Sequence, residues 1–267
     1  MTHLKIVGLV VAAVLAIGAV FAASASAALP EYRTCIKAKI KGTGTFSDKL
    51  CSVPSKGGNK EGGYELGEWN QGKKTTFTGK AGVTTFDAYI PENEAEPWKG
   101  GTVIGSVVCK SGKIAGEITG PKTSTETITY SSCTDAGRKC SSVGEKAGTI
   151  KTQPHLDTLV YGIFGGKKPK KLLLTSVAES IDCEGITIAI DVSALGEISG
   201  DVNTISKSSV ESLSVNAAGG QGEVFCEGSP DGNPGPFFLT AEIDGTTLPM
   251  GESTTASLKG EAMMIEA

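Results

Sequence analysis

Short segments in which apolar and polar residues alternate recur along the chain. In the segment 185–192, GITIAIDV, every second residue is isoleucine or valine, beginning with Ile186. A period of two places these side chains on one face of an extended strand, whereas a helix would scatter them around its circumference. The same alternation appears in ETITY at 126–130 and in ESLSV at 211–215. In TTFDAYI it predicts one face with Phe86, Ala88 and Ile90 and another with Thr85, Asp87 and Tyr89.

β-branched residues dominate these segments, and glycine or proline separates them at short intervals, which is typical of an all-β domain. Outside the N-terminal 27 residues, no segment has sustained helical spacing of apolar residues. We therefore expect an all-β fold, an antiparallel sandwich or barrel that can comprise two related β subunits. A parallel β-helix is the alternative, because stacked coils also repeat small residues.

Two nearly identical pentamers, GEITG at 116–120 and GEISG at 196–200, lie eighty residues apart. Each follows a strand-like segment that contains a cysteine, and each precedes another alternating segment. A phosphate-binding glycine loop requires a helix after it, and neither pentamer is followed by one. We interpret the pentamers as scaffold, with glycines at turns or close backbone approaches and the isoleucine facing inward.

The N-terminal segment 1–27 has the pattern of a secretory signal peptide. Lys5 precedes an uncharged apolar run, and the segment ends in small residues of the A-x-A type at Ala25 to Ala27. This pattern predicts a mature all-β region at 28–267, secreted or associated with the cell envelope, without a membrane span after cleavage. Two halves of this region are expected to meet near 150–171.

The predicted mature region has an uneven charge distribution. Residues 28–171 contain 22 Lys plus Arg against 14 Asp plus Glu, whereas residues 172–267 contain 2 against 15. The basic half, whose densest run is KKPKK at 167–171, is suited to an anionic cell-envelope polymer or a membrane surface. The alternatives are that the two halves attract each other or that the lysines are simply solvated. An acidic chain without a nucleic-acid-binding motif is not expected to bind nucleic acid.

All seven cysteines follow the predicted signal peptide, so disulfides are expected in an oxidising compartment. Proximity in the sequence suggests two pairs, Cys35 with Cys51 and Cys133 with Cys140, the second around an Asp-Ala-Gly turn. The other three, which include at least one free or intermolecular thiol, are Cys109, Cys183 and Cys226. No pair has the short spacing of a structural zinc site, so neither a metal nor another cofactor is expected.

Candidates for catalysis are few. A Ser-His-Asp or Cys-His mechanism would have to use His155, which follows a proline and is expected in a loop. A carbohydrate-active enzyme or a sugar-binding module needs only carboxylates and an aromatic platform. The acidic loop 92–98 offers Glu94, Glu96 and Trp98 for this, although a solvated loop is the simpler interpretation. We expect a non-catalytic protein with a structural or binding role at the cell envelope, and a carbohydrate-directed protein as the alternative.

Several segments together resemble a group of exported β-rich proteins of high-GC Gram-positive bacteria. They are the start ALPEYRTCIKA, the cysteine of KLC, the V-V-C strand followed by glycine, the G-x-I-x-G turn, and the block from SSCT to KCSSVGEKAGTIKT. The resemblance spans most of the predicted mature region. It implies export and a β scaffold, and because no activity is assigned to that group it transfers no functional residue.

Overall fold

The structure of the protein is a computed structural model. It describes residues 30–56, 62–69, 74–95, 100–164, 170–199, 206–214, 224–227, 239–243 and 245–266. The predicted signal peptide 1–27 lies outside these residues. Pro30–Glu266 forms one compact unit. Among the described residues, no helix has the length and apolar composition needed to cross a membrane.

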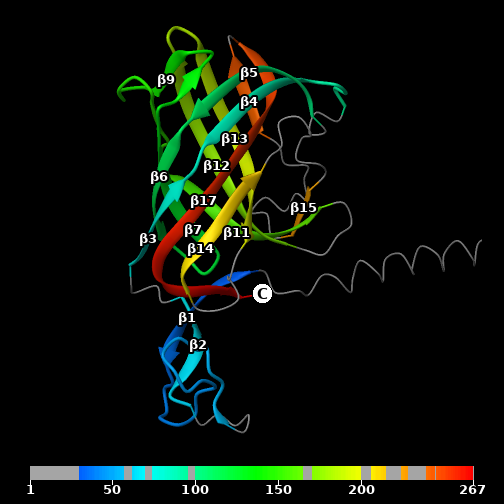
Figure 1. Cartoon of the computed structure of the whole chain (residues 1–267). Helices are drawn as coiled ribbons and strands as arrows, with labels where there is room; N and C mark the ends of the chain where they lie inside the picture. The colour runs from blue at the N-terminus through cyan, green and yellow to red at the C-terminus, as the bar shows by residue number, and fades with distance from the viewer. Residues whose placement is uncertain are drawn as a thin grey trace, which may run out of the picture. The chain divides into compact units, whose positions relative to one another are not determined.

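Nearly all described segments are strands, which confirms the all-β prediction (Figure 1). The strands are β1 (Glu31–Lys37), β2 (Tyr64–Glu68), β3 (Thr75–Ala81), β4 (Thr84–Pro91), β5 (Gly101–Cys109), β6 (Ser111–Ile118), β7 (Thr123–Ser131), β8 (Thr134–Asp135), β9 (Arg138–Ser142), β10 (Thr149–Lys151), β11 (His155–Phe164), β12 (Lys170–Cys183), β13 (Thr187–Ser199), β14 (Ser206–Ser214), β15 (Val224–Glu227), β16 (Leu239–Ile243) and β17 (Thr246–Glu266).

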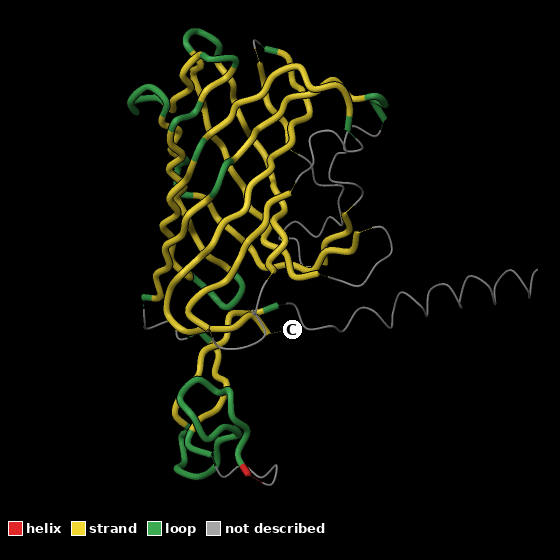
Figure 2. Tube along the Cα trace, in the orientation of Figure 1, coloured by secondary structure: helices red, strands yellow, loops and turns green. Residues whose placement is uncertain are grey.

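The strands form an eight-stranded antiparallel barrel, so that of the expected architectures the barrel is the one observed. Several elements continue one another as a single long strand of the barrel. β3 and β4 pair with successive stretches of β17, and β5 and β6 pair with β4 and β3 in the same way. Neighbours in the barrel are neighbours in the chain, and β17 closes the ring on β3 and β4. Figure 2 shows these long strands wrapping around a common axis.

The predicted strand 185–192 lies in β13, where Ile188 and Ile190 are buried as expected. In β4 the predicted alternation is wrong beyond Ala88. Tyr89 is fully buried and Ile90 is 54% exposed, because a register shift between Ala88 and Tyr89 inserts a bulge that exchanges the two faces. A bulge depends on pairing with β5, so the sequence of β4 alone does not reveal it.

Three disulfides are present among the described residues, which is typical of extracellular proteins. The predicted pair Cys35–Cys51 is confirmed. The predicted pair Cys133–Cys140 is wrong, because Cys133 is bonded to Cys109 and Cys140 to Cys183. Cys226 lies in β15, and its side chain is outside the described part of the structure.

The register of the sheet explains this correction. Four cysteines form one row across the sheet: Cys109 ends β5, Cys133 directly precedes β8, Cys140 lies in β9 and Cys183 ends β12. The backbone N–H of Cys140 donates to the carbonyl oxygen of Cys133, as at the wider position of an antiparallel pair, while the N–H of Cys133 donates to Gly148. The two bonded pairs have Cα separations of 4.0 Å, closer to the narrow type of pair. The predicted turn at Ala136 and Gly137 is present. It places Cys133 opposite Cys140 at a position where the strands are farther apart than at the two bonded pairs.

The barrel interior contains a large apolar cluster around the two buried disulfides, with Ile181, Ile190 and Met250 among its members. A smaller cluster contains Ile118 and Leu159, with Ile198 packed against it. The isoleucines of both pentamers therefore contact the same cluster. A side chain at Gly116 would collide with the ring of Phe77, so the first pentamer needs glycine for packing.

Candidate functional site

A group of ionisable side chains is buried inside the barrel. It consists of Glu126 on β7 and His155 and Asp157 on β11, each at most 6% exposed. The alternating pattern of β7 places Ser124, Glu126, Ile128 and Tyr130 on the inward face, so that Glu126 occupies a core position of its strand. We call these three ionisable residues the interior cluster.

The register of three neighbouring strands brings the interior cluster together. His155 is the direct cross-strand partner of Glu126, and Asp157 lies opposite Ser124 on β7. On its other side, Asp157 lies opposite Thr175 of β12. Side chains directly opposite each other in a sheet have Cβ atoms about 5 Å apart, close enough for hydrogen bonding. The cluster and its hydroxyl partners are therefore nearest neighbours on a single inward face.

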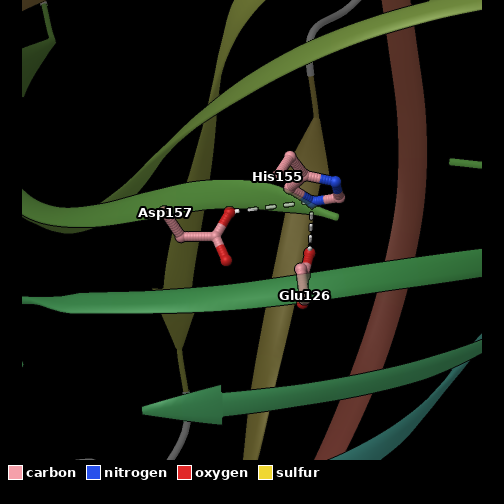
Figure 3. Close-up of side chains that lie close together, drawn as sticks. All are labelled: Glu126, His155 and Asp157. Atoms are coloured by element: carbon pink, nitrogen blue, oxygen red, sulfur yellow. Dashed lines mark hydrogen bonds and ion pairs between the residues drawn. The ribbon is translucent and has the colours of Figure 1, made fainter. Parts of the chain in front are cut away.

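Figure 3 shows the imidazole of His155 between the two carboxylates. His155 Nε2 lies 3.2 Å from Glu126 Oε1 and 3.7 Å from Asp157 Oδ1. The other ring nitrogen, Nδ1, lies 3.2 Å from the carbonyl oxygen of Gln153. A carbonyl oxygen only accepts hydrogen bonds, so Nδ1 carries the proton of that contact. Nε2 is consequently the atom that faces both carboxylates.

Hydroxyl groups complete the surroundings of Asp157. Thr175 Oγ1 donates to Asp157 Oδ1 at 2.8 Å, and Ser124 Oγ donates to Oδ2 at 3.2 Å. Ser124 Oγ is also 3.4 Å from the hydroxyl of Tyr32 on β1. Glu126 differs, because its Oε2 atom is buried and has no hydrogen-bond partner. A buried oxygen without a hydrogen-bond partner destabilises the folded state. Glu126 is therefore the member of the cluster whose hydrogen bonding is incomplete.

Burial and like charge hold protons on the interior cluster. Burial raises the pKa of Asp157 to about 8, and the charge of Glu126 adds to the shift, against the opposing effects of His155 and the two hydroxyls. Burial alone lowers the pKa of His155, but the hydrogen bond with Glu126 and the charges of Asp157 and Glu126 outweigh it and raise the pKa. One imidazolium does not compensate two buried carboxylates, so the cluster retains an additional proton near neutral pH.

A third buried carboxyl group, Glu252, lies on β17. Glu252 Oε1 accepts a hydrogen bond of 3.3 Å from the hydroxyl of Tyr130. Tyr130 is the next inward-facing residue of β7 after Ile128. Burial raises the pKa of Glu252 to about 7, the Tyr130 hydrogen bond lowers it, and the charge of Glu126 raises it further. The interior polar groups thus extend from the cluster to the edge of the large apolar cluster.

The prediction that His155 lies in a loop is wrong. His155 is the first residue of β11 and is buried, because Pro154 ends the preceding connection and leaves the strand to begin at the next position. Neither Glu126 nor Asp157 was predicted as a site residue from the sequence. The available signal was an ionisable residue at an inward position of an alternating strand, which in ETITY is the initial glutamate.

The described residues of the acidic loop are not part of the interior cluster. Glu94 is exposed in the connection between β4 and β5, where Asn93 Oδ1 accepts a hydrogen bond from the backbone of Ala95. Glu96 and Trp98 lie outside the described residues. The sugar-binding interpretation of these residues therefore stays a prediction.

A second feature concerns the connection between β1 and β2. We define the basic loop as residues 37–56, which contain exposed lysines and a single acid, Asp48; the lysines are Lys37, Lys39, Lys41, Lys49 and Lys56. The disulfide Cys35–Cys51 closes this segment, and its side chains Ile40, Leu50 and Val53 are also exposed. The basic loop is thus a covalently constrained, positively charged surface.

Asp48 is engaged within the basic loop itself. Its carboxylate accepts backbone hydrogen bonds from Leu50, Ser52 and Val53, at 3.1, 2.9 and 2.8 Å. The bond from Val53 is the main cause of a lowered Asp48 pKa, and the hydroxyl of Ser52 adds to it. The one negative charge therefore stabilises the conformation of the loop and does not pair with its lysines in the hydrogen bonds described.

The fold and these two features define the protein as a disulfide-braced antiparallel β-barrel with a buried histidine–carboxylate cluster and a basic stapled loop. No family model, curated protein or solved structure matches the chain.

Proposed function

We propose that the protein is an exported, non-catalytic barrel that binds an anionic polymer of the cell envelope through the basic loop. The observation that carries the proposal is the concentration of positive charge on that loop. Residues 37–56 contain five lysines and one acid, a net charge of +4. Charge of one sign on a small surface attracts a polymer of the opposite sign and accelerates its association.

The constraint of the loop favours binding. The disulfide and the hydrogen bonds of Asp48 fix the backbone before any ligand arrives. A preorganised loop loses less conformational entropy on binding than a flexible one, so more of the electrostatic attraction remains as affinity. The predicted signal peptide and the three disulfides support a location where such polymers occur.

The densest basic run of the sequence, KKPKK at 167–171, lies outside the basic loop. Only Lys170 and Lys171 of the run KKPKK are described, and they begin β12. The support for binding therefore comes from the basic loop and not from that run.

The test is sedimentation of the protein with purified cell wall at 20 to 500 mM salt, with soluble dextran sulfate and neutral dextran as competitors. We expect release from the wall as salt rises, because screening is strong beyond about 10 Å at 0.1 M. Dextran sulfate should displace the protein and neutral dextran should not. Binding that resists salt, or equal displacement by neutral dextran, would contradict the proposal.

The variant with Lys39, Lys41 and Lys49 changed to glutamate should bind at least about tenfold more weakly. The matched control carries three glutamates at exposed lysines of the barrel, Lys80, Lys113 and Lys146. It has the same net charge and should bind much more tightly than the loop variant. Equal losses would show that only net charge matters.

A second comparison measures binding to vesicles of phosphatidylglycerol. Tighter binding to these vesicles than to wall polymer would indicate that the exposed apolar side chains of the loop contact a membrane surface, and it would contradict the proposed polymer ligand.

A further inference from the structure

We propose that the interior cluster is a binding site for one divalent transition-metal cation, with zinc as its redox-inert representative. The ligands are Glu126, His155 and Asp157. This inference is independent of the proposed envelope binding, since it concerns the barrel interior and no residue of the basic loop.

The donor set suits such an ion. One carboxylate or nitrogen atom from each residue lies within 4.8 Å of the others. Around a tetrahedral ion with bonds of about 2.0 to 2.1 Å, neighbouring ligand atoms are roughly 3.4 Å apart. The contacts of His155 Nε2 with the two carboxylates, at 3.2 and 3.7 Å, bracket that value. Imidazole together with carboxylates is a donor set of zinc and neighbouring transition metals, whereas calcium and magnesium take oxygen alone.

The hydrogen bonds around the cluster are those of a metal site. A histidine that ligates a metal through one nitrogen usually donates its other N–H to a carboxylate or a backbone carbonyl, which fixes its tautomer. His155 Nδ1 makes that contact with Gln153 and leaves Nε2 directed at the carboxylates. Thr175 and Ser124 similarly hold both oxygens of Asp157 in place.

An independent observation indicates a missing partner. Glu126 is 4% exposed, and its Oε2 has no hydrogen-bond partner although its other oxygen contacts His155. A cation held by the cluster would lie beside this carboxylate and supply that partner. A bound divalent ion would displace the protons of the cluster, and its charge would neutralise the −2 of two carboxylates and a neutral imidazole. Three protein ligands leave one coordination position for water or another ligand, as at open zinc sites.

The composition of the chain allows a specific test. His3 and His155 are the two histidines of the sequence. A full-length chain with His3→Gln and ¹⁵N-labelled histidine therefore has a single imidazole for NMR. We expect zinc to shift the Nε2 signal strongly while Nδ1 keeps its proton, with saturation at one zinc per chain. Titration calorimetry should give the same stoichiometry, and the melting temperature should rise by roughly 5 °C at zinc concentrations 100-fold above Kd.

Isosteric variants locate the site. Glu126→Gln and Asp157→Asn should each weaken zinc binding at least tenfold, while Glu252→Gln, a buried carboxyl outside the cluster, should bind like the parent. Cys226→Ser should also bind like the parent, which excludes a thiol as the zinc ligand. Circular dichroism of each variant checks its fold. A parent chain that binds neither zinc, cobalt(II) nor manganese(II), also after refolding in their presence, overturns the proposal. Unchanged affinity of a folded Glu126→Gln does the same.

Discussion

The two ends of the barrel interior are stabilised by different chemistry, although the same strands build both. Towards the ends of β7 and β12, two disulfides lie among isoleucine and methionine side chains. Nearer the beginnings of the same strands, the inward positions carry Ser124, Glu126 and Thr175 beside the ionisable residues of β11. One end is held by covalent bonds and apolar contacts, whereas the other combines a smaller apolar cluster around Leu159 with buried hydrogen bonds and charge.

This difference shows what each end can do. Apolar packing and disulfides resist changes of pH and gain nothing from a small ligand. A buried set of carboxylates and imidazole changes its protonation with pH and releases free energy when a cation binds. The covalent end gives the barrel stability, and this stability permits an interior polar cluster that is costly by itself.

The largest effect is expected from removing a disulfide of the covalent end. The Cys140–Cys183 bond closes a loop of 43 residues, for which chain entropy gives a loss of about 4 kcal/mol when both cysteines become alanine. Urea unfolding followed by fluorescence measures this loss. The same change at Cys35 and Cys51 constrains a shorter loop outside the barrel and should lower the unfolding free energy of the barrel less. Equal losses for the two double variants would contradict the assigned roles.

The next effect concerns the polar end. His155→Leu removes the partner of Glu126 and leaves two buried carboxyl groups next to each other, with an expected loss of about 3 kcal/mol at pH 7. His155→Gln keeps an N–H group for Glu126 and should lose clearly less. Denaturant unfolding of metal-free protein gives both values. A loss below about 1 kcal/mol for His155→Leu would mean that the histidine does not stabilise the carboxylates.

Much of the fold could be predicted because it is local. Alternation identified 84–90, 126–130 and 185–192 as strand segments, and glycine and proline marked their ends. The disulfide Cys35–Cys51 was accessible from proximity along the chain. Cys109 and Cys183 bond to partners on neighbouring strands of the barrel, and that register is set by turns and by closure of the ring.

The candidate site was harder to predict because it depends on the pairing of strands that are distant in the sequence. Glu126 and His155 are 29 residues apart and meet only because β7 and β11 pair in one particular register. Glu126 shares an alternating face with Ile128 and Tyr130, but nothing in the sequence shows that this face meets His155. The alternation of β7 was visible, but only the closed barrel shows that its glutamate side faces the interior. The bulge that buries Tyr89 could not be predicted either, because it arises from the pairing of β4 with β5.

The last effect depends on pH and locates the boundary between the two ends. The pKa of Glu252 is raised from 4.5 to about 7, so the folded protein binds this proton more tightly than the unfolded chain. Stability from this group is present below about pH 4.5 and is lost as pH rises through about 7. Glu252→Gln keeps an acceptor for Tyr130 but does not ionise, so it should nearly match the parent at pH 4.5 and exceed it by about 3 kcal/mol at pH 8. Unfolding curves of the two proteins across this range measure the difference. A difference in unfolding free energy that stays constant with pH would indicate a packing effect. If the parent is instead more stable than Glu252→Gln at pH 8, the carboxylate is well solvated and the polar region ends before Glu252.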